Sequence, residues 1–199
     1  MKPIISYPFI LVCATFLAHA LVGAYPSGAP DTACDQMRPM HRTSKDNMSS
    51  PLIEPLSGGA SYFTIGVNTT QVGPGDHVAV TITAKENFYF EGFLLQARSN
   101  ENGTTRHGTF MDTSKDGKLV CENAVTHNSN SHKSNVTVIW MAPKTTVNDI
   151  KFVATIVKGY SEIYMQLTSA TSFSVGSGVT LIPSMVIVLL MVFSAVIYN

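Results

Sequence analysis

The chain is poor in charge. Its 13 basic and 13 acidic side chains give a formal net charge of zero, and only 13% of its 199 residues are charged. The charges form no block of one sign along the sequence. A nucleic-acid groove and a cationic membrane-lytic peptide both need a basic excess, so neither function fits this composition. We therefore expect no nucleic acid among its partners.

Motifs that carry catalysis are also missing. The sequence has no Gly-x-Ser-x-Gly nucleophile elbow, and no glycine-rich loop leads from a strand into a helix. His127 and His132 share the segment THNSNSHKSN, but no cysteine or carboxylate beside them completes a metal-ligand set, which favours a solvated polar loop. Asp112 and Asp116 are spaced like part of a calcium loop without its Gly and Glu positions, which favours a hairpin turn. We predict no enzymatic activity, no catalytic residue, no cofactor and no metal site.

The first 24 residues have the three parts of a secretory signal peptide. Lys2 supplies the positively charged n-region, Ile4 to Leu21 form an apolar h-region, and residues 22–24 form a small-x-small cleavage site. We predict cleavage after Ala24, which makes Tyr25 the first residue of the mature chain. An uncleaved signal anchor is the alternative.

The chain has three cysteines, and the predicted secretion indicates which chemical state they adopt. Cys13 lies in the signal peptide, so the mature chain keeps only Cys34 and Cys121. In an oxidising compartment an isolated pair normally forms a disulfide, and two cysteines are too few for a metal site. The bridge would close a loop of about 88 residues, for which the chain-entropy estimate is roughly 4–5 kcal/mol.

Asn-x-Ser/Thr sequons agree with an extracellular chain. The first three stand in polar, turn-like surroundings, and the fourth opens an expected strand. The predicted N-glycosylation sites are Asn47, Asn68, Asn102 and Asn135.

The C-terminal segment carries no charge from Val179 to Tyr198. About twenty residues can cross a bilayer as a helix, but no Lys or Arg follows to mark a cytoplasmic side. A cluster of small residues followed by a polar spacer is the layout of a glycosylphosphatidylinositol (GPI) attachment signal, with Ser169 or Ser174 as attachment site. A single-pass helix is the alternative, and either anchor holds the protein at the cell surface.

Roughly 145 residues, 25–169, remain for one domain, and residues 170–199 form the polar spacer and hydrophobic tail. Up to about Gly59 the domain is rich in Ser, Pro and Gly and lacks helical periodicity, so we expect an irregular strap that Cys34 pins to the body. Beyond it apolar residues alternate with period two. Strands are predicted at 61–67, 78–83, 109–111, 118–121, 135–141, 150–157 and 162–167.

The run FYFEGFLLQAR, Phe88 to Arg98, is predicted to be another strand. It is too short to span a bilayer as a helix. Its bulky residues change parity at Gly92, where a β-bulge would return Phe93, Leu95 and Ala97 to the core side. Seven or eight short strands, no helical pattern and one Trp predict an antiparallel β-sandwich.

Aromatic and basic residues raise the question of a ligand. One group of aromatic side chains could line a groove, but most aromatics in a sandwich of this size belong to the core. The aromatic residues that could line such a groove are Tyr62, Phe63, Tyr89, Tyr160 and Tyr164. Arg98, Arg106 and His107 flank the loop SNENGTTRHG, where they could meet a polar ligand or simply be solvated.

Several stretches, taken in order, resemble the reeler (reelin N-terminal) domain: YPSGAPDTAC, PGDHVAVTI, FEGFLLQAR, GTF, LVCENAVTH, VTVIWMAP and IKFVATIVKGYSEIYMQL. The resemblance covers nearly all of 25–167. It implies an immunoglobulin-like sandwich, a disulfide at Cys34 and Cys121, and a recognition role. Family members often carry further cysteines, which this chain lacks, and its hydrophobic tail departs from soluble members.

Single-domain members of this family are insect secreted defence proteins, and others are spondin-type matrix proteins or ferric-chelate-reductase-like membrane proteins. The resemblance therefore implies recognition of microbial surface glycolipids in innate defence. The alternative is an adhesion protein that binds extracellular matrix or host surface proteins.

Overall fold

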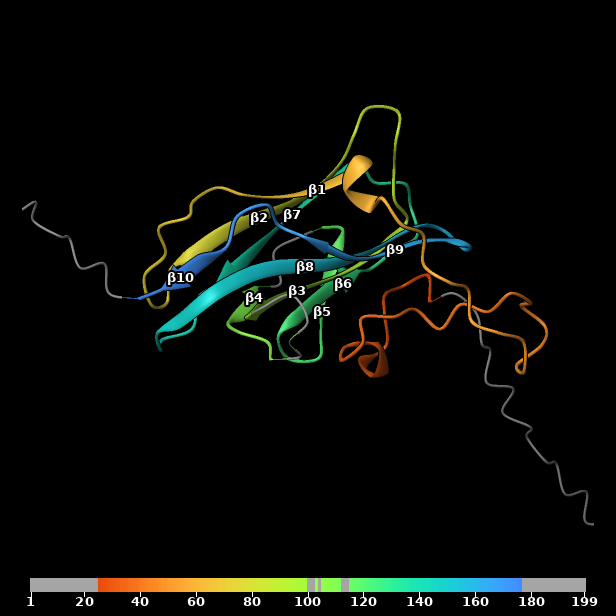
Figure 1. The fold of residues 1–199 in the computed structure, drawn as a ribbon, viewed down its shortest axis with the longest axis horizontal. Helices are drawn as coiled ribbons and strands as arrows, with labels where there is room; N and C mark the ends of the chain where they lie inside the picture. The colour runs from red at the N-terminus through yellow and green to blue at the C-terminus, as the bar shows by residue number, and fades with distance from the viewer. Residues whose placement is uncertain (1–24, 100–102, 104, 112–114, 177–199) are drawn as a thin grey trace, which may run out of the picture.

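Two antiparallel sheets pack face to face in the computed structural model, which describes residues 25–99, 103, 105–111 and 115–176 (Figure 1). The smaller sheet has the strand order β1 (Phe63–Val67), β2 (His77–Ala84), β7 (Asn135–Met141) and β4 (Thr109–Met111). The larger sheet has the order β10 (Phe173–Val175), β8 (Val147–Gly159), β3 (Gly92–Ser99), β6 (Ala124–His127) and β5 (Gly117–Val120), and β9 (Glu162–Thr168) also pairs with β8. Short 3-10 turns lie at Asp31–Ala33 and Gly59–Ser61. The predicted all-β antiparallel class is confirmed.

The period-two pattern of the sequence explains the paired strands β2 and β7. Val80 lies opposite Val138 in the antiparallel register, and both side chains are buried between the sheets. The alternate residues Thr81 and Thr137 face outward, where their hydroxyl groups lie 2.8 Å apart. One face of the smaller sheet therefore forms the core and the other meets solvent.

Trp140 lies at the centre of the core. Its ring contacts Phe152 and Phe173 edge to face at 5.4 and 5.7 Å, and its Nε1 donates a hydrogen bond to the carbonyl of His107 at 2.9 Å. Gly108, at φ +63°, lies directly against the indole, and a Cβ there would come within 2.6 Å of it. The buried indole is thus fully partnered, and its neighbour has to be glycine.

Strand β3 is buried on both faces, unlike the strands of the smaller sheet. Phe93, Leu95 and Ala97 face the core between the sheets, as the sequence predicts. The expected β-bulge at Gly92 is wrong, because β3 begins at Gly92 and pairs with β8 without a register shift. The change of parity falls instead in a bend at Glu91, before the strand begins.

The fold continues to Val175. Phe173 and Val175 are buried in the core, and β10 pairs with the first half of β8. Ser169 is buried as well, and its Oγ accepts a hydrogen bond from the backbone N–H of Phe152 at 3.2 Å. Ser174 is exposed on β10. In the part of the chain that is described, no helix has the length and apolarity needed to cross a membrane. The expected signal peptide and most of the tail lie outside the described residues.

Candidate functional site

The N-terminal strap, residues 25–58, covers the outer face of the larger sheet. It is the orange segment in Figure 1, and it has almost no regular secondary structure. Ala33, Cys34 and Met37 of the strap pack on Leu94 of β3 and Val153 of β8 in a second, smaller core. This packing explains why β3 is apolar on both faces.

The disulfide between Cys34 and Cys121 is formed and ties the strap to the turn between β5 and β6. The two Cα atoms are 6.5 Å apart, and the cysteines are separated by 87 positions in the sequence. The backbone of Cys121 and Glu122 has positive φ, which is compatible with the tight turn between these strands. The strap is therefore fixed covalently at one point.

Two buried polar side chains of β3 hold the same point of the strap. Gln96 Nε2 donates to the carbonyl of Cys34 at 2.9 Å, and Arg98 Nη2 donates to the same oxygen at 3.1 Å and to the carbonyl of Asp35 at 2.9 Å. Arg98 Nε also binds Gln96 Oε1, and its Nη1 binds the carbonyl of Gly103. Burial lowers the pKa of Arg98, and the neighbouring Arg106 lowers it further.

His127, the last residue of β6, binds the start of the strap. Its Nδ1 accepts a hydrogen bond from the backbone N–H of Phe93 at 3.2 Å, so the proton of the neutral ring lies on Nε2, which donates to the carbonyl of Tyr25 at 3.0 Å. A Cβ at position 92 would contact the ring at 2.9 Å, so Gly92 provides the space for His127. Burial lowers the pKa of His127, although the carbonyl oxygens of Phe93 and Tyr25, 3.3 and 3.0 Å from the two ring nitrogens, oppose that shift.

His41 attaches the strap to Tyr160, which lies in the turn between β8 and β9. Its Nδ1 donates to the carbonyl of Tyr160 at 2.7 Å, and the two rings stack with centroids 4.8 Å apart. The ammonium group of Lys45 lies over the ring of Tyr160, 4.4 Å from its centroid. Burial lowers the pKa of His41, and the charge of Lys45 lowers it further. The ring is therefore neutral near pH 7.

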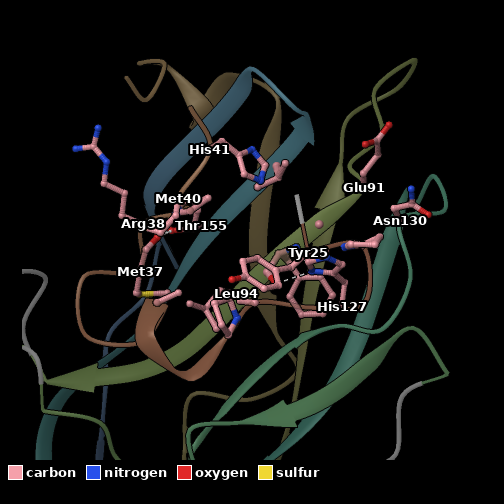
Figure 2. A pocket seen from close by; sticks show the side chains of 18 residues that line it. Tyr25, Met37, Arg38, Met40, His41, Glu91, Leu94, His127, Asn130 and Thr155 are labelled. Carbon is pink, nitrogen blue, oxygen red and sulfur yellow. Dashed lines mark hydrogen bonds between the residues drawn. The ribbon is translucent and has the colours of Figure 1, made fainter. Parts of the chain in front are cut away.

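A pocket of about 100 Å³ lies between the strap and the sheet, bounded by these two histidines (Figure 2). The strap side of the pocket consists mainly of small and apolar residues, together with Tyr25, Arg38 and His41. The sheet side consists of residues from the start of β3, the end of β6 and the second half of β8, with Glu91 and Asn130 beside them. The guanidinium of Arg38 points away from the space in Figure 2 and binds Glu54 at 3.0 Å. The lining residues that the argument below uses are Pro30, Met37, Met40, His41, Leu94 and Val157.

The aromatic residues considered from sequence do not form one groove. Tyr62, Phe63 and Tyr164 contact one another at the edge of the main core, where Tyr62 also stacks on Phe88 at 4.6 Å. Tyr89 stacks instead on His132, and Tyr160 stacks on His41. Only Tyr160 reaches the strap.

Arg98, Arg106 and His107, which flank the connection between β3 and β4, have different environments. Arg98 is 6% exposed and serves as the strap anchor described above, so simple solvation is the wrong interpretation for it. Arg106 lies 3.6 Å from the exposed carboxylate of Asp35, and His107 Nε2 lies 2.9 Å from the hydroxyl of Ser99. Nothing in this arrangement brings the three together toward one ligand.

His127 and His132 have separate partners. His132 stacks on Tyr89 and lies 3.5 Å from Glu91, whereas His127 binds Tyr25. The loop between them is solvated, as the sequence predicts, since Asn128, Asn130 and Ser131 are exposed. Lys133, which follows the loop, is 5% exposed and donates to the carbonyls of Glu91, Ser129 and Ser131. Among the described residues no group of three or more His, Cys, Asp or Glu side chains could hold a metal ion.

Three of the four sequons lie on described surface. Asn47 is exposed in the strap, and Asn68 and Asn135 are exposed at β1 and β7 of the smaller sheet. Asn68 Oδ1 accepts a hydrogen bond from the backbone N–H of Ala79 at 2.8 Å, which leaves its amide nitrogen toward solvent. Asn102 and Asp112 lie outside the described residues.

The sequence analysis did not predict the pocket. Its walls come from segments about a hundred positions apart, and its polar residue His41 stands in a stretch without periodicity. The one useful signal was the buried-type composition of β3 on both faces, which requires a cover on its outer side.

Fold and site together define an all-β domain whose disulfide-bound N-terminal strap closes a small apolar pocket on one sheet. The sequence profile of the Reeler domain matches residues 32–177. The chain belongs to the Reeler domain family.

Similar proteins include putative defence proteins, ferric-chelate reductases and the reeler domain of F-spondin. The chain is 35% identical over 166 residues to "Putative defense protein 3" of Antheraea mylitta, an alignment that covers 81% of this chain and 94% of that protein. It is 32% identical over 167 residues to ferric-chelate reductase 1 of Mus musculus, covering 80% of this chain but only 25% of the reductase.

A crystal structure of the human F-spondin reeler domain superimposes with a TM-score of 0.51 at 26% identity, covering 58% of this chain and 88% of that chain. The reductase similarity is thus confined to a quarter of that protein, whereas the defence protein is matched almost end to end.

Proposed function

We propose that this protein is an extracellular, non-enzymatic recognition protein of innate defence that binds microbial surfaces. The observation that carries the proposal is the match to a defence protein over 94% of that protein's length. A second relative, "Putative defense protein 1" of the same species, is also 35% identical, over 171 residues. The disulfide and the exposed sequons suit an oxidising, extracellular setting.

The strap face is the better recognition surface of the two sheet faces. Glycans on Asn68 and Asn135 would project from the smaller sheet, where both side chains are exposed. The strap face carries the pocket, and cationic side chains belong to it: Arg38 lines the pocket, Lys45 lies over Tyr160 and Lys118 lies beside Gly28. Recognition through this face leaves the sequons at Asn68 and Asn135 outward, whereas the sequon at Asn47 lies in the strap itself.

The test is a co-sedimentation assay of the full chain with intact bacteria. The protein should sediment with the cells, and a Cys34→Ser/Cys121→Ser double variant, in which the strap has lost its covalent attachment, should sediment less. A parallel panel of immobilised matrix proteins addresses the alternative, an adhesion or matrix protein, which the similarity to the F-spondin domain favours. Binding to matrix proteins without binding to bacteria would reject the defence role.

A membrane anchor at the C-terminus belongs to the same proposal. The uncharged run 179–198 supports a tether, and the preference for a GPI anchor rests on the absence of a cationic residue after it. Phosphatidylinositol-specific phospholipase C should release the protein from intact cells. Retention on cells from which the same treatment frees a known GPI-anchored protein would establish the single-pass helix instead.

A further inference from the structure

The pocket under the strap suits a narrow apolar ligand. Leu94 and Val157 of the sheet and Pro30 and Met37 of the strap line a space of about 100 Å³ that is partly open to solvent. A cavity of about 150 Å³ accommodates a benzene ring in another protein core. The smaller, partly open space fits a linear chain better than a ring, since such a chain can leave its remainder outside.

His41 brings a hydrogen-bond acceptor to this largely apolar wall, which Glu91 and Asn130 also line. His41 donates through Nδ1 to the carbonyl of Tyr160 at 2.7 Å, so the neutral ring presents an unprotonated Nε2. None of the described residues donates a hydrogen bond to that atom, and the side chain, 8% exposed, lines the pocket. Figure 2 shows its ring at the edge of the space, across from Tyr25 and His127. A largely apolar wall with an acceptor that lacks a described donor at His41 suits an apolar ligand that carries a donor at that point.

We propose that this pocket binds a linear alkyl or acyl chain that carries a hydroxyl group. The methylene groups lie against Leu94, Val157 and Met37, and the hydroxyl donates a hydrogen bond to Nε2 of His41. Free hydroxy fatty acids have this chemistry, as do the hydroxyacyl groups of bacterial glycolipids. The inference names a ligand class for the recognition function proposed above and rests on that function for the glycolipid source.

A homologous series tests the apolar part of the site. 3-Hydroxybutanoate, 3-hydroxyhexanoate, 3-hydroxyoctanoate and 3-hydroxydecanoate are titrated into the full chain. Each methylene that enters the pocket should raise the affinity about fourfold, and the gain should stop once the pocket is full. An affinity that does not depend on chain length, or no saturable binding of any member, would overturn the proposal.

Methionine methyl groups locate the bound chain in the same titration. With ¹³C-labelled methyl groups, the resonances of Met37 and Met40, which line the pocket, should shift. Those of Met111 and Met141, exposed on the smaller sheet, should not. Shifts confined to the smaller sheet would place the ligand elsewhere and reject the pocket.

His41→Asn tests the hydroxyl contact. The asparagine amide keeps a donor for the carbonyl of Tyr160 but has no equivalent of Nε2. Wild-type protein should prefer 3-hydroxyoctanoate to octanoate by roughly 3- to 10-fold, the range of one hydrogen bond, and the variant should bind both equally. His77→Asn, at an exposed position of β2, is the matched control and should keep the preference. A preference for the hydroxylated acid that survives in His41→Asn, or is absent from wild type, would reject the contact with His41. If His41→Asn fails to fold, the chain-length series and the methionine shifts decide whether the pocket binds the ligand.

Vesicles containing a hydroxyacyl glycolipid separate this inference from the proposed function. Binding of both free acid and vesicles supports both. Binding of the free acid alone supports the pocket and rejects recognition of glycolipid surfaces. Binding of vesicles alone rejects the pocket as the contact and leaves surface recognition in place.

Discussion

Arg98 Nη2 donates a hydrogen bond to the carbonyl oxygen of Cys34, 3.1 Å away, so a buried guanidinium of the sheet holds the residue that forms the disulfide of the strap. Gln96 donates to the same oxygen at 2.9 Å. The strap is therefore fixed twice at one position, once by sulfur and once by a charged hydrogen-bond network. These two attachments can be tested separately.

Replacing Arg98 with Met should destabilise the protein by roughly 2–5 kcal/mol, because three strap and loop carbonyls lose a buried donor. The strap should also become more sensitive to limited proteolysis while the disulfide remains intact. Arg106→Met is the matched control, since Arg106 makes only a 3.6 Å contact with an exposed carboxylate and should change stability by less than about 1 kcal/mol. Equal effects of the two variants in chemical denaturation would contradict the anchoring role.

Replacing Cys121 with Ser should lower the free energy of unfolding by about 2–5 kcal/mol. The reason is that the bridge closes a long loop in the unfolded chain, since the two cysteines lie 87 positions apart in the sequence. Thermal and denaturant unfolding of wild type and variant, both under non-reducing conditions, provide the measurement. An unchanged melting temperature, or two titratable thiols in the native protein, would show that the bridge does not form.

Stability should fall as the pH drops below about 6.5. Burial lowers the pKa of His127 in the folded state, so the unfolded chain binds the proton more tightly. The contribution of His127 is fully present above its ordinary pKa of about 6.5 and decreases as the pH falls toward the lowered folded pKa. Burial shifts the pKa of His41 and His107 in the same direction, so they add to the slope.

His127→Gln isolates one histidine from this slope. The variant should flatten the dependence of unfolding free energy on pH between pH 7 and 5 by at most about 1.4 kcal/mol per pH unit. His77→Gln, at an exposed position, should leave it unchanged. Parallel pH profiles for wild type and His127→Gln would show that His127 is equally protonated in both states.

The sequence predicted the parts of the fold whose residues alternate over several positions. β2 and β7 bury every other residue, and a period of two is readable without any tertiary information. The parity of Phe93, Leu95 and Ala97 was also predictable, although a bend, and not a bulge, produces it.

The strap contacts were not predictable, because they depend on residues that carry no local signal. Arg98 has the sequence context of a loop-flanking, solvated cation, and only the strap above it makes it buried. The acceptor groups are backbone carbonyls of Cys34 and Asp35, which any residue type would supply. The pocket shares this origin, since its shape depends on how an aperiodic segment lies on the sheet.

The last strand, β10, tests where the folded domain ends. Phe173 and Val175 are buried in the main core, and Phe173 lies 5.7 Å from the ring of Trp140. Phe173→Ala should therefore cost about 3–5 kcal/mol, whereas Ser174→Ala on the exposed side of the same strand should change stability by less than about 0.5 kcal/mol. Equal stability of the two variants would show that β10 is not part of the folded unit.

The same strand bears on the lipid attachment site. Attachment at Ser169 would remove both buried residues of β10, and attachment at Ser174 would remove Val175, so each would cost core packing that the domain uses. We expect a GPI anchor to be attached at or after Gly176, where the sequence continues with the small residues Ser177 and Gly178. Mass spectrometry of the C-terminal peptide released by phospholipase C locates the site. A lipid-bearing peptide that ends at Ser169 would mean that the mature domain is stable without β10.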